Sequence, residues 1–346
     1  MTDCDYMKRC FALAENGMNN VSPNPRVGAV VVCDDKIIGE GFHRAYGEPH
    51  AEVNAISHCT YDEPGAKNIL NRSTIYVNLE PCSHYGKTPP CTDLIIKHNI
   101  RRVVISCLDP NPRINGVAKL LEAGIEVVTG VLENEGRWLN RRFFTRITKH
   151  RPYIFLKWAQ STDGFIAPSA TSRDFRLTCE ETRVEDHIFR ANEDAIIVGT
   201  NTLLLDNPQL NKRLCPDKGK NPLRISFDFN ERLPLSLNFF DGSQPSLLFV
   251  SSNSTKKYPF ADIKKIDLQK PVLPQITSLN INSLIVEGGA ALLNSFIKEN
   301  LWDEVYTYTA PIELHSGLKA PSVPLDTILY SEHLSGKDII RKYRRM

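Results

Sequence analysis

The residues best suited to chemistry are a histidine, a glutamate and two cysteines in the first third of the chain. His50 and Glu52 stand two positions apart in GEPHAEVNAI, and Cys82 and Cys91 follow in LEPCSHYGKTPPC. One imidazole and two thiolates suit zinc, and three protein ligands leave the fourth tetrahedral position to water. Because that open position is typical of catalytic zinc, the pattern predicts a metal centre at His50, Cys82 and Cys91.

Glu52 supplies the acid-base group that such a centre needs. Water on zinc ionises near neutral pH, and a carboxylate beside the metal can then carry the proton. The order H-x-E, then P-C, then a second cysteine is the signature of zinc deaminases, although their cysteines stand three positions apart. Here the separation is nine, which predicts a longer loop. Taken singly, each residue is compatible with surface decoration or a buried thiol, and His84 is a poorer ligand because it lies only two positions from Cys82.

The second half of the chain offers a phosphate-binding segment. In SLIVEGGAALLNSF, a strand is expected to end at Glu287, and Gly288 and Gly289 permit close approach to a helix N-terminus that can hold an anion. A Rossmann G-x-G-x-x-G fingerprint does not occur in the sequence. A simple tight turn remains the alternative for this segment.

Alternating strands and helices must position these residues. The first half predicts helices over 3–16, 50–59, 91–98 and 116–124, and strands over 27–33, 36–42, 74–79, 101–107 and 125–130. Such alternation predicts a mostly parallel sheet covered on both faces.

A basic segment around Trp138, Phe143 and Phe144 separates the two halves. We place the boundary after it, which gives a first domain over 1–147 and a second over 148–346. The second predicts strands over 153–159, 195–199, 223–229 and 246–251, a helix over 179–192 and a strand-turn-helix over 284–299. It is therefore α/β as well.

Composition excludes several classes of protein. The 346 residues hold 42 basic and 40 acidic side chains, and the formal net charge of +2 argues against a dedicated nucleic-acid binder. No apolar run approaches the ~20 residues of a membrane helix, and no secretory signal is visible. We expect a cytoplasmic enzyme that acts on a small molecule, without nucleic-acid or membrane partners, and that forms a homodimer or higher homo-oligomer. Its nine cysteines should stay reduced.

Three segments of the first half, SPNPRVGAVVV, GFHRAYGEPHAEVNAI and YVNLEPCSHYGKTPPC, resemble the deaminase domain of the bifunctional riboflavin-biosynthesis deaminase/reductase family. The resemblance implies a cytidine-deaminase-like α/β/α domain in which His50, Cys82 and Cys91 hold zinc and Glu52 transfers the proton. It also implies that the substrate site is lined by Asn24, His43 and Lys87.

The segments YIFLKWAQSTDG, RANEDAIIVGTNTLLLDNPQL and VEGGAALL resemble the reductase domain of the same family, which has a dihydrofolate-reductase-like fold and uses NADPH. The resemblance implies that the sugar phosphate is faced by Arg190, Leu210, Arg213 and Glu287, and Lys157 is expected to help position the substrate. It implies cofactor contacts at Ala159, Thr202, Asp206, Gly289, Ala290, Ala291, Leu292, Leu293, Asn294 and Ser295. The chain departs from the family pattern at Asp174 and Arg176, and an acidic Asp174 would repel a phosphate.

The resemblance as a whole implies two successive reactions with Zn²⁺ and NADPH as cofactors. The first is hydrolytic deamination of 2,5-diamino-6-(5-phosphoribosylamino)pyrimidin-4-one, and the second is reduction of the ribose to give 5-amino-6-(5-phosphoribitylamino)uracil. Residue chemistry alone reaches a zinc deaminase followed by a phosphate-binding α/β domain. Two alternatives stay open: a single-activity nucleoside or nucleic-acid base deaminase with a non-catalytic second half, and a zinc-stabilised RNA-binding protein that uses the basic segment.

Overall fold

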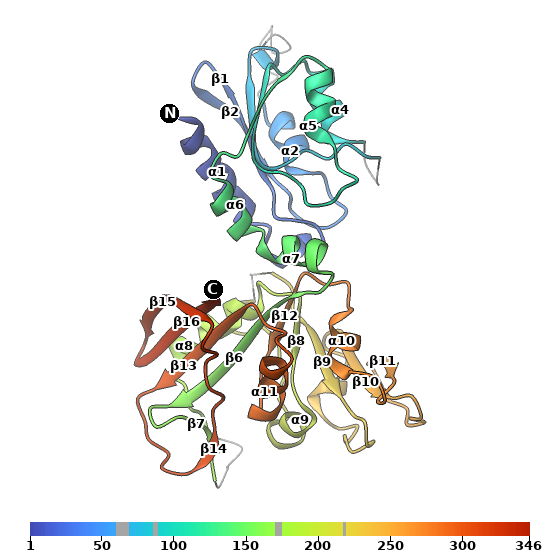
Figure 1. Ribbon diagram of the computed structural model, residues 1–346, viewed down its shortest axis with the longest axis vertical. Coiled ribbons are helices and arrows are strands. Elements are labelled where there is room, and N and C mark those ends of the chain that lie inside the picture. Colours follow the sequence, from blue (N-terminus) through green and yellow to red (C-terminus); the bar gives the residue numbers. More distant parts are fainter. Residues whose placement is uncertain (60–68, 86–88, 170–174, 217–218) are drawn as a thin grey trace. The chain divides into compact units, whose positions relative to one another are not determined.

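The computed structural model describes residues 1–59, 69–85, 89–169, 175–216 and 219–346, and the chain divides into two compact units (Figure 1). The first is Met1–His150 and the second is Arg151–Met346. The division falls a few residues beyond the boundary that we placed between 147 and 148. Among the described residues, no helix is both long enough and apolar enough to cross a bilayer.

The first unit is built on a five-stranded sheet in the order β2-β1-β3-β4-β5. Its strands are β1 (Gly28–Cys33), β2 (Lys36–Phe42), β3 (Thr74–Leu79), β4 (Arg102–Cys107) and β5 (Glu126–Thr129). Its described α-helices are α1 (Asp3–Glu15), α2 (Ala51–Ser57), α4 (Cys91–Lys97), α5 (Gly116–Glu122), α6 (Glu133–Leu139) and α7 (Arg141–Lys149).

The expectation of a mostly parallel sheet is wrong for one side of this unit. β3, β4 and β5 run parallel, but β1 is antiparallel to both β2 and β3. The physical reason is the turn at Asp34 and Asp35, whose φ values of 48° and 60° are those of a tight hairpin that folds β2 back onto β1. The crossover through α2 then makes β3 parallel to β2, with β1 between them.

Side chains that alternate along the strands give this sheet two buried faces. Ala29 and Val31 pack in the cluster that includes residues of α2, α4 and α5, whereas Val30 and Val32 pack with Met7 and its neighbours on α1. Because successive side chains of a strand point to opposite faces, one uninterrupted apolar run can supply both cores. The layers hold the ends of β3 and β4 and the start of α2 in fixed places.

The second unit contains a nine-stranded sheet in the order β11-β10-β9-β8-β12-β6-β13-β16-β15, and a small sheet that pairs β14 with β7. The strands are β6 (Tyr153–Ser161), β7 (Phe165–Pro168), β8 (Ala195–Ile197), β9 (Leu223–Phe227), β10 (Ser246–Ser251), β11 (Asp262–Ile266), β12 (Ser283–Val286), β13 (Glu304–Ala310), β14 (Gly317–Lys319), β15 (Thr327–Ser335) and β16 (Asp338–Arg345). The α-helices are α8 (Glu180–Arg190), α9 (Thr200–Asp206), α10 (Val272–Thr277) and α11 (Ala290–Lys298).

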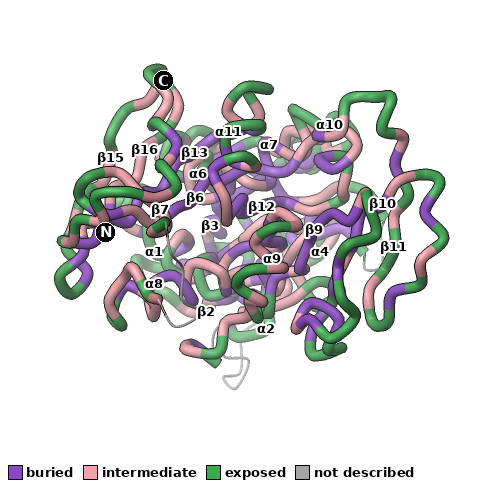
Figure 2. The backbone as a smooth tube through the Cα atoms, turned by 90° about the horizontal axis from the view of Figure 1, so that it is seen from below, coloured by how far each residue is buried: buried purple, intermediate pink, exposed green. Residues whose placement is uncertain are grey.

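The large sheet is parallel from β11 to β13 and antiparallel from β13 to β15. Strands β12 and β13 are buried along their whole length, whereas the edge strands β11 and β15 are largely accessible (Figure 2). Helices α10 and α11 pack on one face through Leu273 and Phe296, and α9 packs on the other through Leu203. Full burial of the central strands fits their continuous apolar sequences.

The basic segment belongs to the first unit, where it forms α6 and α7. The guanidinium of Arg141 lies 4.0 Å from the ring centre of Trp138, and that of Arg137 lies 5.1 Å from Phe144. Arg137 also pairs with Glu133 at 2.8 Å. These cations are used in packing within the unit, which weakens the argument for an RNA-binding surface there.

Candidate active sites

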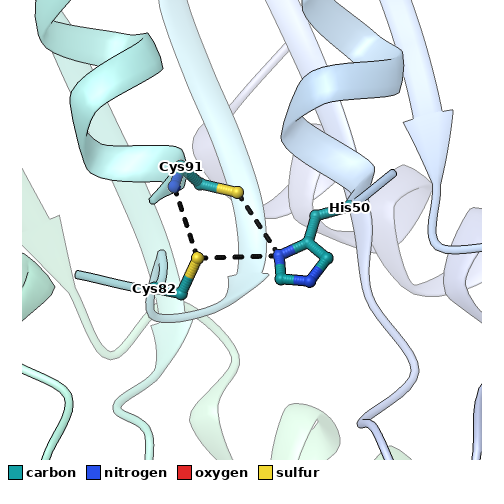
Figure 3. A group of neighbouring side chains, drawn as sticks. All are labelled: His50, Cys82 and Cys91. Atoms are coloured by element: carbon teal, nitrogen blue, oxygen red, sulfur yellow. Dashed lines mark hydrogen bonds between the residues drawn. The ribbon is translucent and has the colours of Figure 1, made fainter. Parts of the chain in front are cut away.

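The three expected zinc ligands meet between two helix starts and a loop (Figure 3). His50 is the residue before α2, Cys91 is the first residue of α4, and Cys82 lies in the loop after β3. His50 Nδ1 lies 3.6 Å from Cys82 Sγ and 3.4 Å from Cys91 Sγ. The three side chains point toward one another, and the backbone N–H of Cys91 donates to Cys82 Sγ at 3.3 Å.

These distances fit zinc. With Zn–N and Zn–S bonds of ordinary length, a tetrahedral site separates nitrogen and sulfur ligands by about 3.5 Å. The two observed separations lie on either side of that value. Among the described residues, these three form the group whose ligand atoms are close enough to hold a metal ion together. His84 is exposed and is not part of that group.

The environment of the ligands also favours a metal-binding thiolate. Hydrogen bonds from Cys91 and His50 hold the pKa of Cys82 far below its usual range. Glu52, in the first turn of α2, is only 3% exposed, and this burial raises the pKa of its carboxyl group. A buried carboxyl whose pKa is raised toward neutrality can take up and release a proton.

A cavity of about 430 Å³ opens onto this group. Its lining includes Asn24, His43, His50, Glu52 and Cys82. The His43 ring is oriented by two contacts: Nδ1 lies 3.1 Å from the Pro49 carbonyl oxygen, and Nε2 lies 3.1 Å from Asn24 Nδ2. Because a carbonyl only accepts, Nδ1 carries the proton, and Nε2 accepts from the Asn24 amide. Burial lowers the pKa of His43 and keeps it neutral. Lys87 lies outside the described residues.

Several polar residues of this cavity were not expected from the sequence, among them Glu80, Asp109, Asn111 and Arg146. The carboxylate of Glu80 accepts the backbone N–H groups of Asp109 and Val117 at 3.1 and 3.0 Å, so it ties the loop after β4 to α5. The sequence nevertheless held a signal for two of them, Glu80 and Asp109. Glu80 and Asp109 follow the carboxyl ends of β3 and β4, the edge at which sites of parallel sheets form.

The second unit has its own, larger cavity of about 1270 Å³. Its lining draws on β6, on the segments that follow β8, β9 and β12, and on α9. All the residues expected to contact the substrate of the reductase line it: Lys157, Arg190, Leu210, Arg213 and Glu287. Most of the expected cofactor residues do too: Ala159, Thr202, Asp206, Gly289, Ala290, Ala291 and Leu292.

Three expected cofactor residues lie elsewhere. Leu293 is fully buried in the hydrophobic core of the unit, because it is on the face of α11 that packs against the sheet. Asn294 and Ser295 are exposed and are not among the residues that line the cavity. The Ser295 hydroxyl donates to the carbonyl of Ala291 at 2.9 Å. Of the expected cofactor segment 289–295, the part that lines the cavity is therefore residues 289–292.

The turn before α11 is shaped for close approach. Gly288 has φ of 105°, and a Cβ atom there would lie 2.7 Å from Thr202 Oγ1. That hydroxyl oxygen accepts the N–H of Gly289 at 3.3 Å. The N-terminus of α11 consequently faces the cavity with no side chain from Gly288 or Gly289 in the way, an arrangement that favours a phosphate group of the cofactor.

Buried ion pairs join charged side chains at this cavity. Lys157 Nζ lies 2.7 Å from Asp186 Oδ1 and 3.3 Å from Glu287 Oε1. Arg190 pairs with the same two carboxylates at 2.8 and 3.0 Å. Sequence analysis missed Asp186, although it precedes Arg190 by one helical turn and so shares its face of α8.

Arg213 has a different environment. It donates to Asn211 Oδ1 at 2.9 Å, and among the described residues no carboxylate forms an ion pair with it. Its partial burial and the positive charges of Arg190, Arg183 and Arg176 lower its pKa. Such a gathering of cations favours an anionic ligand. Arg176 is exposed at the cavity, and Asp174 lies outside the described residues.

Comparison with protein families finds a match in each unit. Residues 1–107 match the cytidine and deoxycytidylate deaminase zinc-binding region, and residues 152–322 match the RibD C-terminal domain. The chain is 40% identical over 335 residues to riboflavin biosynthesis protein RibD of Aquifex aeolicus, covering 94% of this chain and 92% of that protein. It is 40% identical over 331 residues to RibD of Bacillus amyloliquefaciens, covering 92% and 86%.

Solved structures give the same result for the whole chain. A diaminohydroxyphosphoribosylaminopyrimidine deaminase/5-amino-6-(5-phosphoribosylamino)uracil reductase from Thermotoga maritima superposes with a TM-score of 0.89 at 36% identity, covering 99% of each chain. RibD of Acinetobacter baumannii gives 0.88 at 31% identity, again with 99% coverage of each. These matches confirm the predicted fold of each domain. This chain therefore belongs to the RibD family of bifunctional riboflavin-biosynthesis enzymes, in which a zinc-dependent deaminase and an NADPH-dependent reductase are joined.

Proposed function

We propose that the cavity of the first unit deaminates 2,5-diamino-6-(5-phosphoribosylamino)pyrimidin-4-one and that His50, Cys82 and Cys91 hold the zinc ion that this needs. The observation that carries the proposal is the pair of nitrogen-sulfur separations, 3.6 and 3.4 Å, beside a buried glutamate. Zinc held by these three residues would lower the pKa of water and so provide a nucleophile for the amino-bearing ring carbon.

The chain's own residues move the protons and orient the ring. Glu52 passes one proton of the attacking water to the ring nitrogen beside the reacting carbon, and then passes the second proton to the departing amino nitrogen, so that ammonia leaves and a carbonyl replaces the amino group. His43 presents Nε2 toward Asn24, and this pair is proposed to hold the pyrimidine by hydrogen bonds. Lys87 is proposed to contact the substrate as well.

The cavity of the second unit is proposed to reduce the ribose of the deaminated intermediate. Residues 289–292 would hold the phosphates of NADPH, Ala159, Thr202 and Asp206 would make further contacts with it, and the cofactor would supply the hydride. Arg213 is proposed to hold the substrate phosphate, since it lies in the cavity with no carboxylate partner among the described residues.

Three further residues are proposed to contact the sugar chain in that cavity: Lys157, Arg190 and Glu287. Arg190 Nε is buried and makes no hydrogen bond with any described residue, and Glu287 Oε1 is buried with the 3.3 Å ion pair to Lys157 as its contact. A buried donor without a partner is costly, and a hydroxyl-rich substrate would satisfy Arg190 Nε. Leu210 also lines the cavity and contributes an apolar side chain.

One assay separates the possible outcomes. The purified protein is mixed with the diamino-pyrimidinone phosphate, first alone and then with NADPH, while ammonia release and NADPH absorbance are followed. The proposal expects ammonia in both cases and NADPH consumption only after ammonia has formed. Ammonia without any NADPH consumption would instead favour a single-activity deaminase, and neither signal would overturn both assignments.

The proposal extends to location and assembly. A cytoplasmic location is supported by nine free cysteines. A homodimer is supported by the edge strand β15, on which Ile328 and Leu329 are 45% and 46% exposed and Leu334 is 70% exposed. Light scattering of the purified protein tests this, because a monomer at working concentration would contradict the homodimer.

A further inference from the structure

Asp186 is a buried carboxylate whose role is not explained by the site described so far. It is 7% exposed, it lies on α8, and it does not line the reductase cavity. Its two oxygens nevertheless contact two cations that do line it: Oδ1 lies 2.7 Å from Lys157 Nζ, and Oδ2 lies 2.8 Å from an Arg190 nitrogen. A residue in this place acts on the substrate only through its neighbours.

The contacts of the two cations are unequal. Arg190 has Glu287 as a second partner at 3.0 Å, and that contact is a hydrogen bond. Lys157 has Glu287 only at 3.3 Å, and its other neighbour is the ring of Tyr308, whose centre lies 4.7 Å away. Loss of the Asp186 charge would therefore leave Arg190 held, but Lys157 would lose its shorter ion pair.

Charge balance leads to the same residue. Lys157 and Arg190 bring two positive charges into a buried region, and Asp186 and Glu287 balance them. Although burial opposes its ionisation, the charges of Arg190 and Lys157 lower the pKa of Asp186, so it remains a carboxylate. Without Asp186, Glu287 would have to neutralise both cations, and it could not then turn toward a substrate hydroxyl without leaving them unpaired.

We propose that Asp186 is a positioning residue of the reductase: it fixes the Lys157 ammonium group at the cavity wall and leaves Glu287 available to the sugar of the substrate. This inference rests on the proposed role of Lys157 in holding the sugar. It assigns a role in the reductase site to a residue of α8 that the substrate does not touch.

A double-mutant cycle tests the proposal. Asp186→Asn keeps the side-chain shape and removes the charge, Lys157→Met removes the ammonium group, and the third variant carries both changes. The full chain is assayed with already deaminated substrate and NADPH. We expect Asp186→Asn to lower reductase kcat/KM by about 10- to 100-fold in the native background and by less than about two-fold in the Lys157→Met background.

The opposite pattern overturns the inference. Equal losses in both backgrounds would mean that Asp186 acts independently of Lys157, as a purely structural residue would. If Lys157→Met alone keeps full reductase activity, the proposed role of Lys157 fails first, and the inference about Asp186 fails with it. The two failures are thus distinguishable.

Two controls separate positioning from folding. Asp241→Asn removes the carboxylate that pairs at 3.0 Å with the buried Arg224, in the same unit but outside the cavity lining. It is expected to lower the melting temperature and keep reductase kcat/KM. The NADPH dissociation constant, measured by fluorescence titration, should change by less than about two-fold in Asp186→Asn, because Asp186 pairs with Lys157 and Arg190, neither of which is proposed to contact NADPH. A large loss of NADPH affinity would contradict a role through Lys157.

Discussion

The two cavities of this enzyme differ in how their functional groups are arranged. In the first unit, three soft or borderline ligand atoms meet within 4.8 Å of one another, and a single glutamate stands beside them in a cavity of about 430 Å³. In the second, charged side chains from β6, α8 and the end of β12 share their partners around a cavity of about 1270 Å³. The first site places its reactive groups on a few neighbouring atoms, and the second spreads its charged groups over several side chains.

The difference predicts how each site fails. Removal of one ligand from a three-ligand zinc site leaves too few donors, so the loss should be nearly complete. Removal of one cation from a site with several leaves the others in place, so the loss should be graded. The following substitutions test that contrast, beginning with the largest expected effect.

Cys82→Ser should abolish zinc binding and deamination, because a serine hydroxyl is a poor ligand for zinc. Elemental analysis should find about one zinc ion per native chain and far less in the variant. Cys59→Ser is the matched control: Cys59 is another buried thiol of the same unit, its Sγ donates to the Ala55 carbonyl, and burial raises its pKa to about 11. Full zinc occupancy in Cys82→Ser would remove Cys82 from the ligand set.

Glu52→Gln should keep zinc and lower the deamination rate by at least ~100-fold, because it removes proton transfer and leaves the ligands in place. Reduction of already deaminated substrate should continue at the native rate, since the reductase residues belong to a separate compact unit. Elemental analysis and the two assays are run on one preparation. Loss of zinc would make Glu52 a ligand, and a parallel loss of both activities would contradict independent sites.

Arg213→Ala should raise the substrate KM of the reductase by the equivalent of about 1.5–3 kcal/mol, the strength of a charge-assisted hydrogen bond, while NADPH affinity and deamination stay nearly unchanged. Arg213→Lys should recover only part of the loss, because a point charge replaces a planar fork. Steady-state kinetics with deaminated substrate give both constants. Weaker NADPH binding at unchanged substrate KM would place Arg213 on the cofactor's side of the cavity.

The smallest effect is expected at His187, on α8. Burial and the charge of Arg190 lower the pKa of His187 to about 4, and its Nδ1 accepts the Leu214 N–H at 3.4 Å. In the unfolded chain this pKa is about 6.5. Between pH 6.5 and 4 the unfolded state therefore binds more protons, and the free energy of unfolding falls as the pH falls through that window. Melting temperatures at pH 7 and 5 should differ less in His187→Asn than in the native protein. An equal difference would show that His187 is not the titrating group.

Much of the fold could be predicted before the structure. Apolar periodicity predicted the five strands and the helices α1, α2, α4 and α5 of the first unit to within a few residues, but not α6 and α7, which lie in the basic segment. The segments around His50, Cys82 and Glu287 indicated a zinc deaminase and a phosphate-binding domain, and the family resemblance supplied the two reactions. Strand direction was harder, because β1 is antiparallel to its neighbours on both sides, and the segments alone do not show which strand lies between which. Leu293 was expected to contact the cofactor but lies in the core, because helical periodicity turns every third or fourth residue inward.

What the sequence by itself determined is which groups are candidates: a set of side chains suited to zinc, a glutamate beside it, and a glycine turn suited to phosphate. These follow from side-chain type and local spacing, which the chain carries unfolded. What only the tertiary structure decided is partnership across long separations. Asp186 meets Lys157 because α8 packs beside β6, and Glu80 accepts the N–H of Asp109 because β3 and β4 run side by side. The sequence cannot display such pairs, since the free energy that brings them together comes from burying the apolar faces of both elements and not from the pairs themselves.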